Sequence, residues 1–366
     1  MKKVLLSSAA LATLAFAAPA FAQEESGVKL DLGGHFKGYG VYVDQDENTG
    51  EEARSLDILR NTEVHFSGET TLDNGLTVGA HVEAEADDGD SFAVDESYAY
   101  FSGSWGRVNF GAEDGAAFLL QVAAPSADSN YDGIRQFVQP LNTAVLAGGQ
   151  TTALSATYAD GLDYDQDVSG KSDKLTYLTP VFSGFQAGVS YTPEVRDASR
   201  ALDGVDDDES STSEFGDAFD VAVRYEGAFD GFNLNAGAGY SHAAVEDDTS
   251  AEDREAWNAG VDLDIGSWGL GVAYTNDDEG SDDDDVTTWV VGADYTTGPF
   301  TLGASYLNQD DEVGTDVDTD RWTGGVVYSY GPGMTFRGTV SNVNHEIDGL
   351  DDVDATAVMV GTQINF

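Results

Sequence analysis

The sequence contains no cysteine, so disulfide bonds and thiol chemistry are excluded. Basic residues are scarce as well: 16 Lys and Arg stand against 67 Asp and Glu, which gives a formal net charge of −51 at pH 7. So negative a chain would be repelled by nucleic acids and by bare anionic surfaces, and both are excluded as binding partners. The charge favours cations, divalent metal ions and salty surroundings.

Long apolar runs are missing after residue 22, so the sequence predicts no membrane-spanning helix. The segment 1–22 differs from the rest, because two lysines precede an uncharged run rich in Ala and Leu. It ends in AFA at 20–22, the small-x-small pattern that signal peptidase cleaves. We therefore predict a cleaved secretory signal over 1–22, a single β-barrel domain over 23–366, and a location beyond the inner membrane.

Apolar and polar residues alternate with a period of two through most of the remaining chain, which is typical of half-buried β-strands. In 300–307, Phe300, Leu302, Ala304 and Tyr306 share one face of the expected strand. The pattern predicts sixteen strands, over 28–43, 58–71, 76–86, 94–102, 107–113, 174–181, 185–192, 218–228, 232–242, 255–265, 269–276, 286–296, 300–308, 320–330, 334–343 and 355–366.

The connections between these segments alternate between short and long. Every second one is a tight turn such as the DNG at 73–75, built from residues that favour turn backbone angles. The others are longer and acidic, for example DDEGSDDDD at 277–285 and QDDEVGTDVDT at 309–319. Aromatic residues gather beside the short turns, which is typical of a membrane interface. The sequence thus predicts an all-β fold: a 16-stranded antiparallel transmembrane β-barrel with short periplasmic turns and long acidic external loops.

The last predicted strand, 355–366, ends on Phe366. An unpaired strand edge in lipid would leave backbone groups without hydrogen bonds, at several kcal/mol each. We therefore expect this strand to close the barrel by pairing with 28–43, with Phe366 facing outward at the short-turn rim.

Together, the signal sequence, the sixteen alternating segments, the turn in TTLDNGLTVGAHVEAEA and the terminal Phe366 resemble the Gram-negative general diffusion porins. The stretches YAYFSGSWGRVNFGAED (98–114) and KLTYLTPVFSGFQAGVSYTPE (174–194) are most similar to that family. The resemblance covers the whole mature chain and lies in the order of degenerate motifs. It implies a homotrimer in the outer membrane, contact with lipid and lipopolysaccharide, passage of small hydrophilic solutes and ions, and recognition of the terminal aromatic residue by the insertion machinery.

The connection over 114–173 is far longer than the rest and contains GAAFLLQVAAP, which is too apolar for a solvated loop. Since similar porins fold the loop after strand five into the barrel, we expect an inward-folded constriction loop here. Its candidate pore-facing residues are Asp114, Asp128, Asp132 and Arg135. The alternative for Arg135 is a simple ion pair with a neighbouring acid.

Polar residues on the inner face of the strands are the candidate wall of the pore. The candidates are Lys37, His65, His81, Arg107, Lys174, Arg224 and Arg337. Charges of both signs across a narrow passage create a transverse field that orders water and polar solutes. The alternative is that each is a solvated lumen residue with no individual role.

These observations favour passive diffusion through a water-filled pore that prefers cations, because acidic loops concentrate cations at its mouth. A substrate-selective pore and a secreted acidic protein that binds divalent ions are the alternatives. We expect no enzymatic activity. Glu63 and His65 share a face, as do His81 and Glu83, but polar lumen residues explain these pairs more simply than catalysis.

We predict no cofactor, with one alternative: Ca²⁺ or Mg²⁺ held by the acidic external loops. The sequence from Asp44 begins like a calcium-binding loop but has Thr49 where the tight turn needs Gly, and Ser55 where the bidentate Glu would stand. We expect no confident metal site from these motifs.

Overall fold

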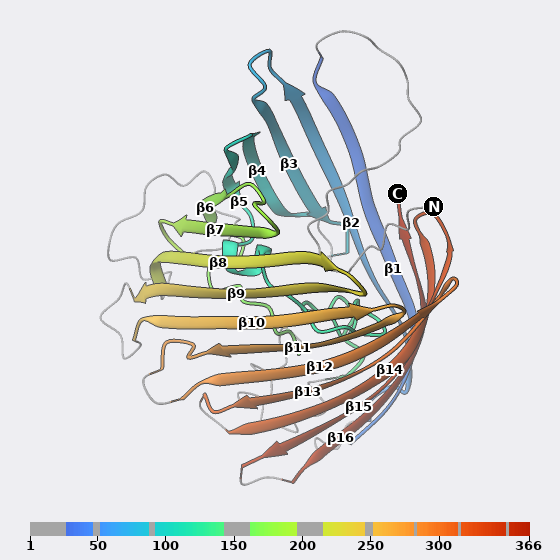
Figure 1. Cartoon of the computed structure of the whole chain (residues 1–366). Coiled ribbons are helices and arrows are strands. Elements are labelled where there is room, and N and C mark those ends of the chain that lie inside the picture. The colour runs from blue at the N-terminus through green and yellow to red at the C-terminus, as the bar shows by residue number, and fades with distance from the viewer. Residues whose placement is uncertain are drawn as a thin grey trace.

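Sixteen antiparallel strands form one closed barrel in the computed structural model (Figure 1). The structure describes residues 27–46, 52–87, 92–142, 162–195, 215–245, 252–281, 284–313, 316–348 and 351–366. Each strand pairs with its neighbours in the sequence, and β1 pairs with β16. The predicted signal segment 1–22 lies outside the described residues. The predicted fold class, a closed 16-stranded antiparallel barrel, is confirmed.

Thirteen strands have nine residues or more, the length that a tilted membrane crossing requires, whereas β5, β6 and β7 have seven, six and eight. Their bounds are β1 Lys29–Gln45, β2 Leu56–Thr71, β3 Thr77–Glu85, β4 Ala93–Gly103, β5 Gly106–Ala112, β6 Asp173–Leu178, β7 Phe185–Thr192, β8 Phe215–Phe229, β9 Phe232–Val245, β10 Arg254–Ile265, β11 Trp268–Asp277, β12 Val286–Thr297, β13 Phe300–Asp311, β14 Val317–Gly331, β15 Met334–Ile347 and β16 Val353–Asn365.

A single short helix, α1 (Ala116–Leu119), stands among the described residues, in the connection between β5 and β6. Within the described part of the chain, no helix has the length and apolar character that a membrane crossing needs.

Burial alternates along the strands, because successive side chains point to opposite faces of a sheet. In β16, Ala357 and Met359 are buried inside, whereas Val358 and Val360 are exposed on the outer surface. The exposed large apolar side chains recur on the outer face of strand after strand, including Leu32, Ile58, Phe110, Val221, Val291, Trp322 and Val340. A water-soluble protein rarely exposes so continuous an apolar surface, so this band is suited to contact with lipid.

The barrel closes through β1 and β16, which pair over eleven residue positions from His35↔Asn365 to Gln45↔Ala355. The last residue extends this seam: the Gly34 amide donates to the Phe366 carbonyl at 3.0 Å, and the Phe366 amide donates to the Gly34 carbonyl at 3.1 Å. Phe366 has half of its surface exposed, as expected for a rim residue. The predicted pairing of the first and last strands is therefore confirmed.

Aromatic side chains form two girdles on the outer surface, where the sequence predicted one. Near the short turns, aromatic rings pair at centroid distances of 4.6–4.9 Å in Phe185–Tyr225, Phe229–Phe232, Trp268–Tyr295 and Phe300–Tyr328. Nearer the long loops, rings pair at 4.4–4.5 Å in Trp257–Tyr274, Tyr274–Trp289 and Tyr306–Trp322. Two such girdles mark the two interfaces of a membrane.

Two boundaries differ from the prediction for physical reasons. The predicted strand 174–181 ends at Leu178 because Pro180 has no backbone N–H with which to continue the ladder. The predicted loop 309–319 shrinks to 312–316, since β13 and β14 stay paired as far as Asp311↔Val317. Acidic side chains weaken the alternation in the sequence there, but they do not prevent backbone pairing.

We expect a charge on the outer band to destabilise the barrel. Val291 of β12 is exposed and lies between the two girdles, so Val291→Lys should cost about 2–4 kcal/mol if that surface faces lipid. The control is Thr275→Lys, at a half-buried, inward-facing position on β11, where the lumen tolerates charge. Urea unfolding in lipid vesicles measures the difference. Equal stability of the two variants would contradict a lipid-facing band.

Candidate functional site

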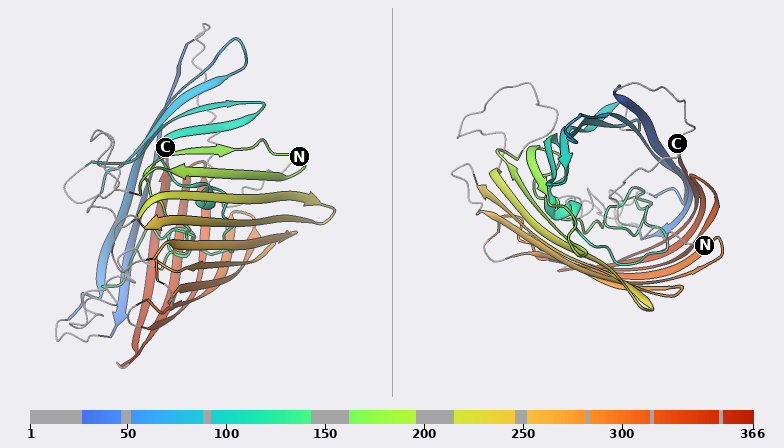
Figure 2. Two further views of the ribbon diagram at one scale, coloured as in Figure 1. Left: turned by 90° about the vertical axis from the view of Figure 1, so that its left-hand side faces the viewer. Right: turned by 45° about the horizontal axis from the view of Figure 1, so that its top comes forward.

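The segment between β5 and β6 lies inside the barrel rather than above it (Figure 2). It is described over 113–142 and 162–172, and it includes α1. Its contacts follow one side of the inner wall, from β7 to β16 and on to β1. The predicted connection 114–173 therefore occupies the lumen in its described parts, while 143–161 lies outside the described residues.

Glycines in the wall make room for this inner loop. On β12, a Cβ at Gly292 would overlap the Pro125 carbonyl, and on β10 a Cβ at Gly260 would overlap the Val122 carbonyl. The same close approach recurs along the loop's course. The inward-facing glycines in contact with it are Gly188, Gly237, Gly239, Gly260, Gly271, Gly292, Gly303 and Gly325, which we call the glycine track. A side chain at these positions would hold the loop away from the wall.

Hydrogen bonds fix both ends of the loop to the wall. The Ala116 amide donates to Ser190 Oγ of β7 at 2.8 Å. Gln166 Nε2 donates to Ser241 Oγ of β9 at 2.8 Å, and Asn258 Nδ2 of β10 donates to Gln166 Oε1 at 2.5 Å. The wall residues are buried, so these bonds replace contacts with water.

Asp128 anchors the middle part of the loop. Arg337 of β15 donates from Nη1 to Asp128 Oδ1 at 2.6 Å, and Tyr39 of β1 and Thr339 of β15 donate through their hydroxyl groups. The Asp128 side chain is fully buried, which makes this ion pair costly to break. The predicted residues Asp128 and Arg337 thus meet where the loop joins the wall.

Asp132 is likewise fully buried, between the loop and β13. Its carboxylate accepts bonds from Ser305 Oγ at 2.9 Å and from the Asp128 amide at 3.1 Å. Burial raises the pKa of Asp132 to about 6, in spite of the nearby charge of Arg321. The structure places this predicted residue in the fixed part of the loop.

Arg135 stands at the centre of an acidic cluster on the loop. Its guanidinium lies 2.8 Å from Asp165, 3.0 Å from Asp167 and 3.4 Å from Asp114. Burial alone would lower the pKa of Arg135, but these three carboxylates outweigh it and raise the pKa. The alternative given for Arg135, pairing with neighbouring acids, matches this geometry, although a quarter of the side chain remains exposed.

A second cation, Lys171, joins the loop to β4. Its Nζ lies 2.6 Å from both Glu96 and Asp114. Burial would lower the pKa of Lys171, and the charges of Asp114 and Glu96 raise it by more, so the amine stays protonated. Sequence reasoning missed Lys171 and Glu96. Lys171 lies in a connection without strand periodicity, and nothing in the sequence pairs it with β4.

The wall opposite the loop is formed by β1 to β5 and carries most of the other predicted residues. Lys37 points its Nζ at the Phe137 ring of the loop, 2.9 Å from the centroid. Arg107 of β5 donates to Asn109 Oδ1 at 2.6 Å and stacks over Tyr100 at 4.0 Å. These contacts hold the two basic side chains at the inner surface.

The predicted residues His65 of β2 and His81 of β3 belong to the same wall. His65 Nε2 lies 3.3 Å from Glu63 and 3.4 Å from Glu83, and His81 Nε2 lies 3.5 Å from Glu83. The shared faces of Glu63 with His65 and of His81 with Glu83 were visible in the sequence. The proximity of the two pairs to each other was not.

Two predicted residues lie away from this wall. Lys174 of β6 is buried beneath the loop, where its amine donates to the carbonyls of Gly170, at 2.6 Å, and Glu113. Arg224 of β8 pairs with Glu226 at 2.7 Å. Lys174 therefore supports the loop from below.

The inner loop and the wall of β1 to β5 carry unlike charged groups. The loop carries the acidic cluster around Arg135, and the wall carries His65, Lys37 and Arg107. Charges of both signs across a narrow pore would produce a transverse field. A sixteen-stranded barrel is wide enough to hold water, and a loop inside it occupies part of that width.

Comparison with known proteins identifies the family. The profile of the Gram-negative porin family matches residues 7–348 of this chain, which is most of its length. The chain therefore belongs to the Gram-negative porins, which places it in the outer membrane as a β-barrel channel protein.

The solved structures that resemble this one are porins too. The anion-selective porin from Comamonas acidovorans has a TM-score of 0.64 with 17% identity, over 93% of this chain and all of that one. OmpT of Vibrio cholerae has a TM-score of 0.59 with 15% identity, over 94% of this chain and 99% of that one. At such low identity, the likeness shows the shared fold.

Curated relatives add little on function. An uncharacterised protein of Rickettsia prowazekii is 25% identical over 217 residues, which cover 53% of this chain. The match spans about half, 48%, of that relative.

We expect Gly292→Ala to displace the inner loop. The added methyl group would meet the Pro125 carbonyl and push the loop into the passage, so single-channel conductance should fall and stability should drop by about 1–3 kcal/mol. Gly324→Ala on β14 is the control, because a Cβ there has its nearest neighbour at 3.9 Å. Planar-bilayer recording of both variants makes the measurement. Unchanged conductance in Gly292→Ala would contradict the role assigned to the glycine track.

Proposed function

We propose that this porin is a passive diffusion channel for small hydrophilic solutes and ions. The observation that carries the proposal is the inner loop, which lies along the wall from β7 to β1 and faces a charged wall on β1 to β5. A loop anchored by a buried ion pair and a row of glycines suits a fixed constriction better than a moving gate. Fixed constrictions sort solutes by size and charge.

We propose further that the channel prefers cations. The sequence has a net charge of −51, and the loop gathers Asp114, Asp165 and Asp167 around one arginine. Carboxylates at a narrow, poorly solvated site raise the local concentration of cations. The porin from Comamonas acidovorans shares the barrel fold but is anion-selective. We therefore attribute the proposed cation preference to these residues and not to the barrel.

Two finer expectations remain part of this proposal. The family resemblance implies a homotrimer, and a lipid-facing barrel implies contact with lipid and lipopolysaccharide. The substrate-selective alternative would need a continuous aromatic track in the lumen. Instead, Tyr39 and Tyr131 are fully buried and donate hydrogen bonds to Asp128 and Ser341, where the loop meets the wall. Buried rings offer no track for a solute, which favours passive diffusion. Binding of Ca²⁺ or Mg²⁺ at the acidic external loops stays a prediction.

Planar-bilayer recording under a salt gradient tests the proposal. We expect stepwise openings, grouped in threes if the protein is a trimer, with a reversal potential biased toward cations. An anion-biased reversal potential would refute the cation preference alone. The absence of channel openings from a folded, detergent-stable sample would refute passive diffusion. Gel mobility before and after heating reports the trimer separately.

The cation preference should depend on pH near neutrality. Burial, followed by the charge of Asp114, raises the pKa of Asp167 to about 7. A carboxyl group loses its charge when the pH falls below its pKa, so the preference should weaken between about pH 8 and about pH 6.

Asp167→Asn should remove part of this pH dependence and lower the cation preference at about pH 8. Asp230→Asn is the control, because Asp230 lies in the exposed short turn between β8 and β9. Reversal potentials at the two pH values make the measurement. The role assigned to Asp167 would be wrong if Asp167→Asn gave the same reversal potential as the parent protein at both pH values.

A further inference from the structure

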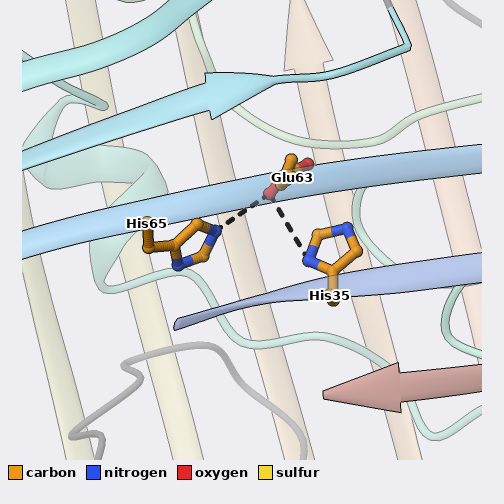
Figure 3. Close-up of side chains that lie close together, drawn as sticks. All are labelled: His35, Glu63 and His65. Atoms are coloured by element: carbon orange, nitrogen blue, oxygen red, sulfur yellow. Dashed lines mark hydrogen bonds and ion pairs between the residues drawn. The ribbon is translucent and has the colours of Figure 1, made fainter. Parts of the chain in front are cut away.

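Three histidines and two glutamates line up across β1, β2 and β3 on the wall that faces the inner loop. From β1 to β3 they are His35, Glu63, His65, Glu83 and His81, which we call the His–Glu row. Figure 3 shows the first three, with Glu63 between the two imidazole rings. Neighbouring histidine rings lie 6.1 Å and 5.7 Å apart at their centroids, so the row is continuous.

The distances between neighbouring candidate ligand atoms match those found around a bound metal ion. His35 Nδ1 lies 3.5 Å from Glu63 Oε2, and His65 Nε2 lies 3.3 Å from the same oxygen. A tetrahedral zinc site with bonds of about 2.1 Å places its ligand atoms roughly 3.4 Å apart. The three atoms all lie within 4.8 Å of one another, so a small ring rotation completes the set.

The outer histidines are held so that one nitrogen is left for a ligand bond. His35 Nε2 lies 2.7 Å from Asn61 Oδ1, so in the tautomer with the proton on Nε2 it donates a hydrogen bond to that oxygen and the Nδ1 lone pair faces Glu63. His81 Nδ1 lies 2.9 Å from Ser67 Oγ, and its Nε2 faces Glu83. Metal-binding histidines in proteins are oriented by such partners on the second nitrogen.

We propose that the His–Glu row binds a divalent transition-metal ion of the zinc class. Within the described residues, two groups have suitable spacing: His35 with Glu63 and His65, and His65 with His81 and Glu83. Both groups include His65, whose Nε2 offers a single lone pair, so the row takes one ion through His65 at a time. Three protein ligands leave a fourth position open to water.

The ligand chemistry selects this class of ion. Imidazole suits Zn²⁺, Cu²⁺ and Ni²⁺, whereas Ca²⁺ and Mg²⁺ prefer sites made of oxygen atoms alone. Glu63 and Glu83 supply two negative charges that balance the charge of a divalent ion. The five side chains have exposed fractions of 8–21%, so they are reachable from the lumen yet largely shielded from water.

A bound ion would lie where the wall of the lumen meets the inner loop. His35 packs edge-on against Phe137 of the inner loop, with ring centroids 6.0 Å apart, and Lys37 covers the same ring. An added divalent charge here opposes the passage of other cations and occupies part of the cross-section. Binding itself is independent of the proposed function, but an effect on conductance depends on it.

Calorimetric titration of the detergent-solubilised protein with Zn²⁺, after treatment with a chelator, tests the site. We expect binding of one ion per chain through the row, and binding of Ca²⁺ under the same conditions to be much weaker. His65→Gln should weaken zinc affinity by at least about tenfold, because His65 belongs to both groups. Asn61→Ala, which removes only the orienting partner of His35, should weaken it by about ten- to a hundredfold if the first group is the one occupied.

His242→Gln is the matched control. His242 also neighbours two acids, Asp253 and Glu255, each at 3.9 Å, but it lies on β9 away from the row. Its loss should leave zinc binding through the row unchanged. Gel mobility after heating verifies that each variant is folded. Zinc affinity that is unchanged in His65→Gln, or absent from the parent protein, would overturn the proposal.

Bilayer recording separates this inference from the proposed function. Micromolar Zn²⁺ should lower the conductance and cation preference of the parent protein but not of His65→Gln. Channel openings that zinc does not change, together with no zinc binding in calorimetry, would refute the metal site but not the proposed channel function. Zinc binding in calorimetry without any channel openings would refute the proposed channel function but not the metal site.

Discussion

Every strand of this protein that crosses lipid must find hydrogen-bond partners on both of its edges, because the membrane interior offers no water in their place. That requirement makes the pairing of β1 with β16 the contact on which the rest of the structure depends. The exchange of bonds between Gly34 and Phe366 carries the seam to the last residue. Once the cylinder is closed, side-chain alternation assigns apolar residues to the outside and polar residues to the lumen.

A closed cylinder of this size has an interior that wall side chains alone do not fill. The inner loop fills much of it, and the wall is shaped to receive the loop. Glycines such as Gly292 let the loop backbone approach closely, and Asp128 fixes it through Arg337 and Tyr39. The loop thereby covers the wall from β7 to β16 and also contacts β1 through Phe137 and β4 through Lys171.

The same cross-strand geometry that builds the wall also concentrates its chemistry. His35, Glu63 and His65 come from neighbouring strands, and antiparallel pairing places His35 directly opposite Glu63. On the loop, Arg135 and Lys171 hold carboxylates together that would otherwise repel one another. The proposed selectivity and the proposed metal binding therefore draw on a few groups on the inner loop and the neighbouring wall, while most of the chain's negative charge lies elsewhere.

The sequence by itself determined the sixteen strands, their order and the alternation of short and long connections, whereas the inward course of the segment after β5 was expected from the family resemblance. Period-two patterning and turn residues are local properties, so they can be read without coordinates. It also identified His65 and His81 as lumen residues. Only the tertiary structure decided that Asp128 and Asp132 are buried anchors, that Lys171 reaches Glu96, and that Glu63 and Glu83 flank one histidine. These contacts depend on strand register, barrel closure and the path of the loop, which join residues far apart in the chain and leave no periodic signal in it.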